Sequence, residues 1–446
     1  WLLAFGYDLF GTHLWVSLLL AELCIAAAYI FVFLLGRDLM GARAALLGTL
    51  LLPAVAHFTL DALRYNHNVV QLPLWIGFCF CLWRASGSER LVWWILTGAI
   101  AALGLYAKFT MGLVIAFGAL WIMLDAEARS RLRGRALYVG LLVFVVLLLP
   151  LAMGLGATDF VALTWVARES AHRGIAGGHF LRDVGKTVLF MALGLIGGMA
   201  ASRVPLRWTA PLPDPAAEPA IASRAFVFLL LMGGGPMLLT LAMAMVKPAR
   251  LEWAAPMYSM IGLLLVALAI RIRPRAARWA RAGLRHAVLA LVASLAVLGH
   301  DATADLQDRA AGHIQKIMWP SAEIAARFDR IWQTATAQPL RIVGGGSWVA
   351  GTVGLLSTGH PSLFTNLDPE LSPAVTEPRL EQDGMLVLWN DDSAWRPDGD
   401  LIARFPHGRE VFTVGPKAVP VAVNYLLVAP DQWTDADWDQ WVEQAD

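Results

Sequence analysis

Between Thr12 and Gly299 the chain repeats one pattern about ten times: an apolar run long enough to cross a bilayer, followed by a short break. A membrane-spanning helix needs about 20 mainly apolar residues. We expect spans at approximately 13–35, 44–60, 69–85, 91–107, 109–124, 136–156, 184–202, 224–246, 254–271 and 284–300. The sequence therefore predicts a polytopic α-helical membrane protein with about ten transmembrane helices.

The charged residues divide the chain into two parts of opposite sign. From Asp301 onward, 10 Lys and Arg stand against 21 Asp and Glu, whereas the residues before it hold 25 against 13. The whole chain is 58% hydrophobic and 15% charged, and soluble domains have nearer a quarter of their residues charged. We therefore expect a membrane domain over 1–300 and a soluble domain over 301–446.

The soluble part shows strand patterns that alternate with helical ones. Strands are expected at 340–343, 385–389 and 421–428, with a helix over 319–337, which predicts a small C-terminal α/β domain. The first strand runs into Gly344-Gly345-Gly346, which resembles a dinucleotide-binding fingerprint only loosely because Val349 stands in place of the third glycine. An ordinary strand-to-helix turn is the favoured interpretation.

Basic residues set the orientation, because cytoplasmic loops of membrane proteins carry the excess of Lys and Arg. With ten spans, the loops fall into two alternating sets that hold seventeen and eight basic residues. The richer set comprises Arg37, Arg43, Arg84, Arg90, Arg129, Arg131, Arg133, Arg135, Arg203, Arg207, Arg224, Arg271, Arg273, Arg275, Arg278, Arg281 and Arg285. This set is expected in the cytoplasm, which places the C-terminal domain on the extracytoplasmic side.

Polar residues at the outer ends of the helices are candidates for function, since ionisable groups near a membrane are costly and usually functional. The outer turn between the second and third spans carries Asp61, Asn66, His67 and Asn68. It is either a solvated hairpin or a lining that donates hydrogen bonds to a polar headgroup.

Cations supply the other candidates. Lys108 stands alone between two apolar helices, and it either extends to the interface or binds a phosphate as a point charge. Lys247 and Arg250 lie in a short outer loop ahead of Tyr258. This group suits an anionic lipid headgroup, with interfacial anchoring as the alternative.

Several of these segments resemble the glycosyltransferase C superfamily, and within it family 39, which includes protein O-mannosyltransferases and the aminoarabinose transferase of lipid A. The resemblance covers roughly 1–270. Its segments are Tyr65-Asn66-His67-Asn68-Val69-Val70-Gln71-Leu72-Pro73-Leu74-Trp75, Gly104-Leu105-Tyr106-Ala107-Lys108-Phe109, Lys247-Pro248-Ala249-Arg250-Leu251-Glu252-Trp253-Ala254-Ala255-Pro256 and Gly36-Arg37-Asp38-Leu39-Met40-Gly41-Ala42-Arg43-Ala44-Ala45.

The resemblance implies a transmembrane glycosyltransferase domain over 1–300 and a periplasmic domain over 301–446, in a bacterial inner membrane. A sugar on polyprenyl phosphate would be the donor, and a hydroxyl of an unknown acceptor (lipid, glycan or protein) would attack its anomeric carbon. A carboxylate of the first outer loop would act as base, while Lys and Arg would stabilise the leaving phosphate. The expected substrate-binding residues are Asn66, His67, Asn68, Lys108, Lys247, Arg250 and Tyr258.

Two features depart from the family pattern. The chain begins where the family's acidic first outer loop would end, which suggests an N-terminal truncation and leaves Asp61 as the nearest carboxylate for a catalytic role. Asn68 occupies a position where many relatives have Asp, and an amide cannot accept the proton.

Other functions stay open at this point. A transporter or flippase of a lipid-linked sugar, or of another amphipathic solute, is the main alternative, and it would show inverted repeats. A non-catalytic scaffold is the third. No cofactor is required, a divalent metal is left open, and a nucleic-acid partner is not expected.

Overall fold

The computed structural model describes residues 2–11, 13–59, 65–157, 221–246, 251–272, 319–391, 395–414 and 419–433, with short pieces at 160, 164, 181–182, 184–185, 187–189, 191, 292 and 393. The chain divides into two compact units, Trp1–Ala302 and Thr303–Asp446. Each unit is a separate body with its own hydrophobic core, and the two are described in turn.

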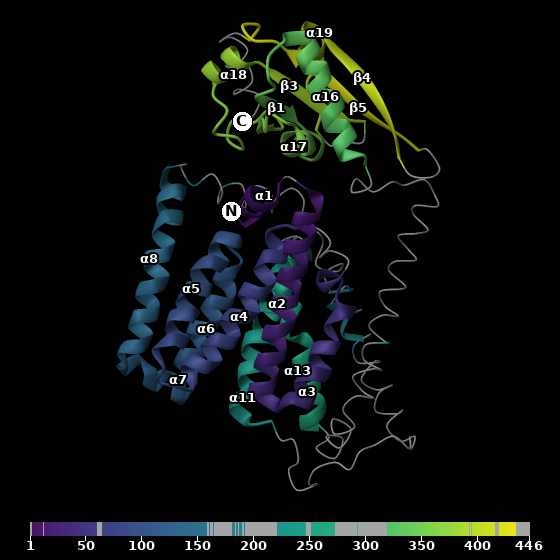
Figure 1. The fold of residues 1–446 in the computed structure, drawn as a ribbon. Coiled ribbons are helices and arrows are strands. Elements are labelled where there is room, and N and C mark those ends of the chain that lie inside the picture. The colour runs from purple at the N-terminus through teal and green to yellow at the C-terminus, as the bar shows by residue number, and fades with distance from the viewer. Residues whose placement is uncertain are drawn as a thin grey trace. The chain divides into compact units, whose positions relative to one another are not determined.

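The first unit is a bundle of apolar helices (Figure 1). Its described α-helices are α1 Leu2–Phe10, α2 Leu14–Met40, α3 Ala42–Leu50, α4 His67–Ser86, α5 Leu91–Ala107, α6 Met111–Leu124, α7 Ala126–Ser130, α8 Arg135–Ala157, α11 Ser223–Leu229, α12 Gly235–Val246 and α13 Ile261–Ile272. Shorter turns are η1 Leu52–Ala54, η2 Ala56–Phe58, η4 Arg131–Arg133, η5 Leu230–Gly234 and η6 Leu251–Met260.

Among the described residues, five helices are long and apolar enough to cross a membrane, or six if the bent pair Met111–Leu124 and Ala126–Arg133 forms one span. The prediction of a polytopic helical membrane protein is confirmed. The number ten remains a prediction, because the expected spans 184–202 and 284–300 lie largely outside the described residues.

Proline shortens one predicted span and interrupts another. The span expected over 44–60 is α-helical only to Leu50 and continues in 3₁₀ turns, because Pro53 has no backbone N–H to extend an α-helix. The span expected over 224–246 passes through a π-helical turn, Leu230–Gly234, which ends two residues before Pro236. The wider turn accommodates the proline ring within a continuous helical path.

The helix α4 forms the centre of this unit and lies between α2 and the α5–α6 pair (Figure 1). In its most apolar stretch 72% of the residues are buried, against 6% for α8. The exposed face of α8 carries leucines and valines such as Leu142 and Val146, which suit contact with lipid. Depth in the bundle therefore distinguishes the buried helix α4 from α8, whose exposed apolar face suits lipid.

Small residues allow α5 and α8 to pack closely. A methyl group on Gly140 would lie 2.8 Å from the carbonyl carbon of Trp94, and one on Gly98 would lie 2.9 Å from that of Gly140. The hydroxyl of Tyr106 on α5 adds a polar link, since it donates to the Leu147 carbonyl at 3.0 Å and accepts from the Leu151 amide at 3.1 Å. This hydroxyl satisfies backbone groups beside Pro150, where a membrane offers no water.

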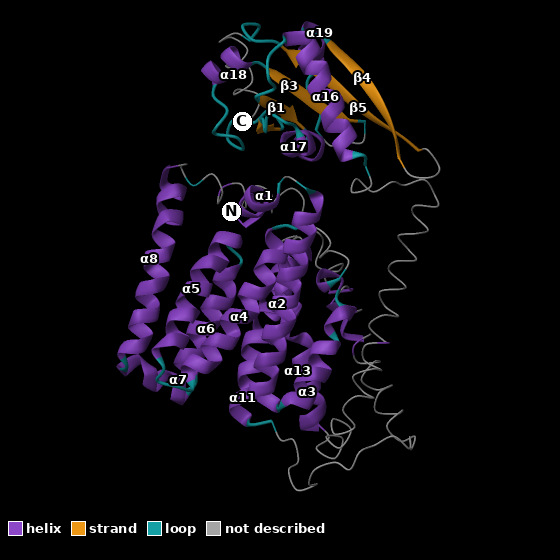
Figure 2. Ribbon diagram, in the orientation of Figure 1, coloured by secondary structure: helices purple, strands orange, loops and turns teal. Residues whose placement is uncertain are grey.

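The second unit is a three-layer α/β domain (Figure 2). Its elements are α16 Ser321–Thr336, β1 Ile342–Gly345, α17 Ser347–Leu356, β2 Ser362–Thr365, α18 Glu377–Asp383, β3 Met385–Asn390, α19 Gly399–Arg404, β4 His407–Val414 and β5 Val419–Val428. The strand order is β2-β1-β3-β5-β4; the first three strands are parallel, and β5 is antiparallel to both of its neighbours.

Alternate residues of the buried strand β3 point to opposite faces of this sheet. Leu386 and Leu388 pack with α16 and α17, while Val387 and Trp389 pack with α18 and α19. Both faces are covered by helices, which explains why all six residues of β3 are buried.

Candidate functional site

The polar residues that precede α4 first serve the helix itself. Asn66 is its N-cap: the side-chain oxygen accepts hydrogen bonds from the backbone N–H of Asn68 at 2.8 Å and of Val69 at 3.2 Å. These bonds satisfy two of the donors that a helix leaves unpaired at its start. Asn66, expected to bind substrate, therefore has a structural role, and the neighbouring His67 is exposed.

Asn68 and Lys108 meet where α4 begins and α5 ends. The Lys108 ammonium donates a hydrogen bond to the side-chain oxygen of Asn68, although the two residues lie forty positions apart. Lys108 is half-buried and directly follows α5, where the negative end of the helix dipole stabilises a cation. The structure thus brings together two of the residues that the sequence analysis selected separately.

A second polar pair extends this contact into the bundle. Gln71 is fully buried on α4, and its side-chain amide donates to the hydroxyl of Thr110 at 2.9 Å, while that hydroxyl lies 3.1 Å from the amide oxygen. Because Gln71 lies three residues after Asn68, both side chains stand on the face of α4 toward the α5–α6 turn. The spacing was visible in the sequence, but nothing there identified Thr110 as the partner.

Tyr258 and His57 form a further contact in the same unit. Their ring centroids are 5.8 Å apart with the rings inclined by 49°, and Tyr258 is only 1% exposed. The tyrosine lies in the 3₁₀ helix η6, just before α13. Tyr258 is therefore a buried residue of the bundle. Its expected role in binding substrate stays a prediction.

Three of the predicted site residues, Asp61, Lys247 and Arg250, lie outside the described residues. Within the part of the chain that the structure describes, no group of three or more His, Cys, Asp or Glu side chains could hold a metal ion. The described portion of the site therefore consists of amides, hydroxyls and one lysine ammonium.

The arginines expected in the cytoplasm gather at the opposite ends of the same helices. Arg224 binds the carboxylates of Asp125 at 3.0 Å and Glu127 at 2.9 Å, and its guanidinium lies 4.7 Å from the ring centre of Trp83. Arg84 at the end of α4 pairs with Asp38 at the end of α2. The polar end at Asn68 and Lys108 and this arginine-rich end thus lie one helix length apart.

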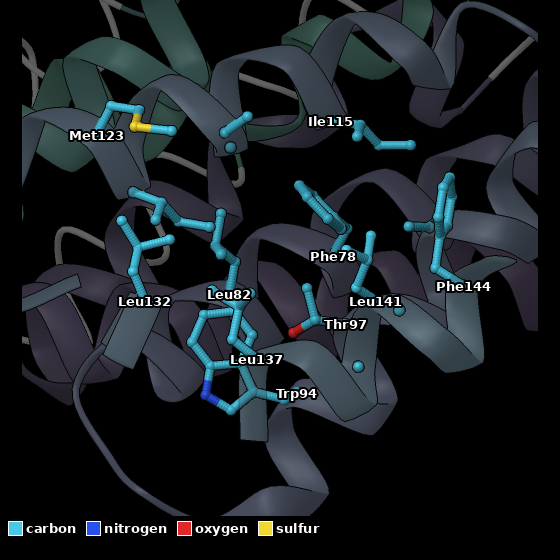
Figure 3. Close-up of a pocket in the computed structure, with 16 residues that line it drawn as sticks. Phe78, Leu82, Trp94, Thr97, Ile115, Met123, Leu132, Leu137, Leu141 and Phe144 are labelled. Atoms are coloured by element: carbon cyan, nitrogen blue, oxygen red, sulfur yellow. The ribbon is translucent and has the colours of Figure 1, made fainter. Parts of the chain in front are cut away.

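Between the two ends lies an open apolar cavity of about 360 Å³, lined by residues of α4, α5, α6, η4 and α8 (Figure 3). Phe78, Trp94, Ile115 and Phe144 are among its lining residues, and Thr97 contributes a hydroxyl. Along α5 the cavity extends from Trp94 to Ala101. At about 1.5 Å per residue it therefore lies roughly 10–20 Å below Lys108. Such a cavity suits a hydrocarbon chain.

Comparison with known proteins adds to this geometry. Residues 1–153 match the family described as dolichyl-phosphate-mannose-protein mannosyltransferase. This segment includes α4, α5 and the pair of Asn68 and Lys108. The resemblance to the glycosyltransferase C superfamily is confirmed.

A solved structure resembles this chain in fold. The chain is similar to ArnT from Cupriavidus metallidurans bound to undecaprenyl phosphate, with a TM-score of 0.59, 14% sequence identity, and coverage of 95% of this chain and 86% of that one. The apo form of ArnT gives a TM-score of 0.54 with the same identity and coverage. No curated protein matches the sequence. The fold of this chain is therefore similar to that of ArnT over most of its length.

Proposed function

We propose that this protein is a membrane glycosyltransferase that moves a sugar from a polyprenyl-phosphate donor to an acceptor hydroxyl. The reaction takes place at the periplasmic face of a bacterial inner membrane, at the helix ends that carry Asn68 and Lys108. In this proposal the full membrane domain, 1–300, has ten spans, and the domain 301–446 lies in the periplasm.

The contact between Lys108 and Asn68 carries the proposal. At this half-buried ammonium a phosphate oxygen can replace the amide oxygen as acceptor, and a bond to a charged oxygen is the stronger one. Asn68 then orients the ammonium and can bind a sugar hydroxyl. The family match over 1–153 and the bound undecaprenyl phosphate of the ArnT structure support a polyprenyl phosphate as that anion.

The chemistry follows from this placement. The acceptor oxygen forms a bond to the anomeric carbon while the bond from that carbon to the phosphate oxygen breaks, and the polyprenyl phosphate leaves with the electron pair. Lys108 stabilises the negative charge that grows on the leaving phosphate. The proton of the acceptor hydroxyl passes to a carboxylate. Asp61 is the carboxylate nearest in the sequence to Asn68, and we assign it this role. Asn68 cannot take this role.

The apolar cavity suits the lipid part of the donor. With the phosphate at Lys108, a hydrocarbon tail that enters the bundle between α5 and α6 reaches the cavity within about 20 Å. Burial of an apolar tail there contributes binding energy of about 25 cal/mol per Å² of surface removed from water. Binding energy from this tail holds the reacting phosphate in place.

The test uses the full chain in liposomes with a radiolabelled polyprenyl-phosphate sugar. Transfer of label to an acceptor is expected, and Lys108→Ala and Lys247→Ala should each slow it at least about tenfold, because removal of one oxyanion donor costs a factor of 10²–10³ in known enzymes. Arg133→Ala is the matched control: it removes one exposed cation at the opposite end of the bundle and should leave the rate unchanged.

Two results would overturn parts of the proposal. If label crosses between leaflets without covalent transfer, the protein is a flippase. If both lysine variants transfer sugar at the normal rate, the phosphate site is elsewhere.

A further inference from the structure

The carboxyl ends of β1 and β3 in the second unit form the kind of crevice where α/β proteins bind ligands. With the order β2-β1-β3, the chain leaves β1 through α17 toward β2 and returns through α18 to β3 on the other side. Since α17 and α18 cover opposite faces of the sheet, the crevice opens at this change of direction.

The floor of the crevice is the start of α17. Gly346 is its N-cap and provides no side chain to bind the free backbone N–H groups of the first turn, Ser347, Trp348 and Val349. The Gly346 amide itself donates to the Leu388 carbonyl at 3.1 Å, which fixes the turn against β3. An exposed helix start of ten residues is an anion-binding element, although by itself it identifies no ligand.

Asn390 supplies an independent observation. It is the last residue of β3 and is 4% exposed, yet among the described residues no hydrogen bond to its side-chain amide is found. The side-chain nitrogen and oxygen of Asn390 are not among the described buried atoms that lack a partner, so the amide reaches the surface at this end of the sheet and is accessible to a ligand. The alternation of β3 puts this amide on the α17 face, beyond Leu388 and opposite Val423 of β5. It therefore points into the crevice beside the start of α17.

Ser393 completes the polar lining. A methyl group on Gly346 would lie 3.1 Å from the Ser393 hydroxyl, which shows that this hydroxyl faces the N-cap. The carboxylate that follows Asn390 in the chain, Asp391, lies on the other face of the sheet, where it binds Arg409 at 2.7 Å and Asn424 at 2.8 Å. Asp392 lies outside the described residues.

We propose that this crevice binds an oxyanion of the phosphate class, carried by a free phosphate compound or by a lipid headgroup. Donors converge on it from the first turn of α17, the Asn390 amide and the Ser393 hydroxyl. A dinucleotide is not favoured, because Val349 packs in the core where a dinucleotide site needs a third glycine for close helix–strand contact. This proposal is independent of the transferase site in the membrane unit.

Hydrogen exchange on the full chain in nanodiscs tests the proposal, because it reports the crevice separately from any phosphate site near Lys108. In one arm inorganic phosphate is added to phosphatidylcholine nanodiscs, and in the other the nanodiscs contain phosphatidic acid without free phosphate. We expect slower exchange in peptides covering 346–353. Protection by inorganic phosphate identifies a free ligand, and protection only by phosphatidic acid identifies a lipid headgroup.

Two variants localise the effect. Asn390→Leu keeps the side-chain size and removes the amide, and Gly346→Ala fills the floor of the crevice at a residue whose φ of −58° any side chain accepts. Each should raise the half-saturating phosphate concentration by about tenfold or more, as expected for loss of a hydrogen bond to a charged group. Gln333→Leu on the exposed side of α16 is the control and should leave it unchanged.

The result also separates the two proposals. Lys108→Ala should keep the protection of 346–353 even where sugar transfer is lost. Absence of protection in both arms, or equal protection in Asn390→Leu and Gly346→Ala, would overturn the inference.

Discussion

The close contact of α5 with α8 gives a sharp test of the packing, because α8 carries two glycines in opposite situations. A methyl group on Gly140 would lie 2.8 Å from the carbonyl carbon of Trp94 and 3.1 Å from its Cβ. A methyl group on Gly156 meets nothing within 4 Å. Both glycines belong to α8, so Gly140→Ala and Gly156→Ala differ chiefly in what the added methyl group touches.

The expected free energies have opposite signs. Replacing glycine by alanine inside a helix stabilises it by about 0.5–1 kcal/mol, and Gly156→Ala should show this gain. Gly140→Ala has the same gain but must move α8 away from the backbone of α5, and overpacking of this kind costs about 1–3 kcal/mol. Moving α8 away from α5 would also weaken the hydrogen bonds of Tyr106 to Leu147 and Leu151. The two variants should therefore differ by about 1–3 kcal/mol, with Gly140→Ala the less stable.

Thermal unfolding in detergent at a fixed scan rate measures this difference. At about 2–4 °C per kcal/mol for domains of 150–250 residues, Gly140→Ala should unfold several degrees below Gly156→Ala. Gly98→Ala, which meets Gly140 from the other helix, should behave like Gly140→Ala. The double variant should cost less than the sum of the two, because one separation of α5 and α8 makes room for both methyl groups. Equal unfolding temperatures for Gly140→Ala and Gly156→Ala would show that α5 and α8 are not packed through these glycines.

Three further predictions concern hydrogen bonds at the helix ends. Asn66→Ala should destabilise the membrane unit by about 1 kcal/mol through loss of the N-cap, and Asn66→Asp should keep full stability in the same melting assay; equal loss in both would contradict the capping role. Arg224→Ala should cost about 1–3 kcal/mol because it leaves Asp125 without its cation and Glu127 with Arg131 alone. Arg224→Lys should recover only part of this, since an ammonium cannot bind two carboxylates and stack on Trp83 as a guanidinium does. Tyr106→Phe should lower stability by about 1–2 kcal/mol, measured against Tyr138→Phe, whose hydroxyl binds the Leu132 carbonyl in an exposed turn.

The sequence was most informative where lipid is the solvent. A long apolar run has one stable form in a bilayer, the helix, and the boundaries expected for 69–85, 91–107 and 136–156 fall within two residues of α4, α5 and α8. The sequence was less informative where a single residue changes the backbone geometry. Pro53 shortened the helix expected over 44–60, because hydropathy does not register a missing N–H.

The roles of single polar residues were harder to predict. Asn66 and Asn68 are identical in type and two positions apart, yet one caps α4 and the other holds Lys108. The cap could have been recognised, since asparagine directly before an apolar helix is a common N-cap. Asn390 could not, because its significance lies in its burial beside α17, which depends on the order of the strands.

The contact between Asn68 and Lys108 shows how far sequence reasoning can extend. The helices α4 and α5 are antiparallel neighbours joined by the short turn at 87–90. Residues equally far from that turn must lie at the same depth, and 68 and 108 are each twenty positions from Ser88. A hairpin of two helices therefore predicts that this amide and this ammonium share one end of the bundle, whichever face of the membrane that end occupies. No such symmetry relates His57 to Tyr258, whose contact depends on the packing of η6 against the rest of the bundle. The contact of Lys108 with Asn68 thus rests on a local geometry that the chain specifies by itself, and the placement of Tyr258 depends on the assembled fold.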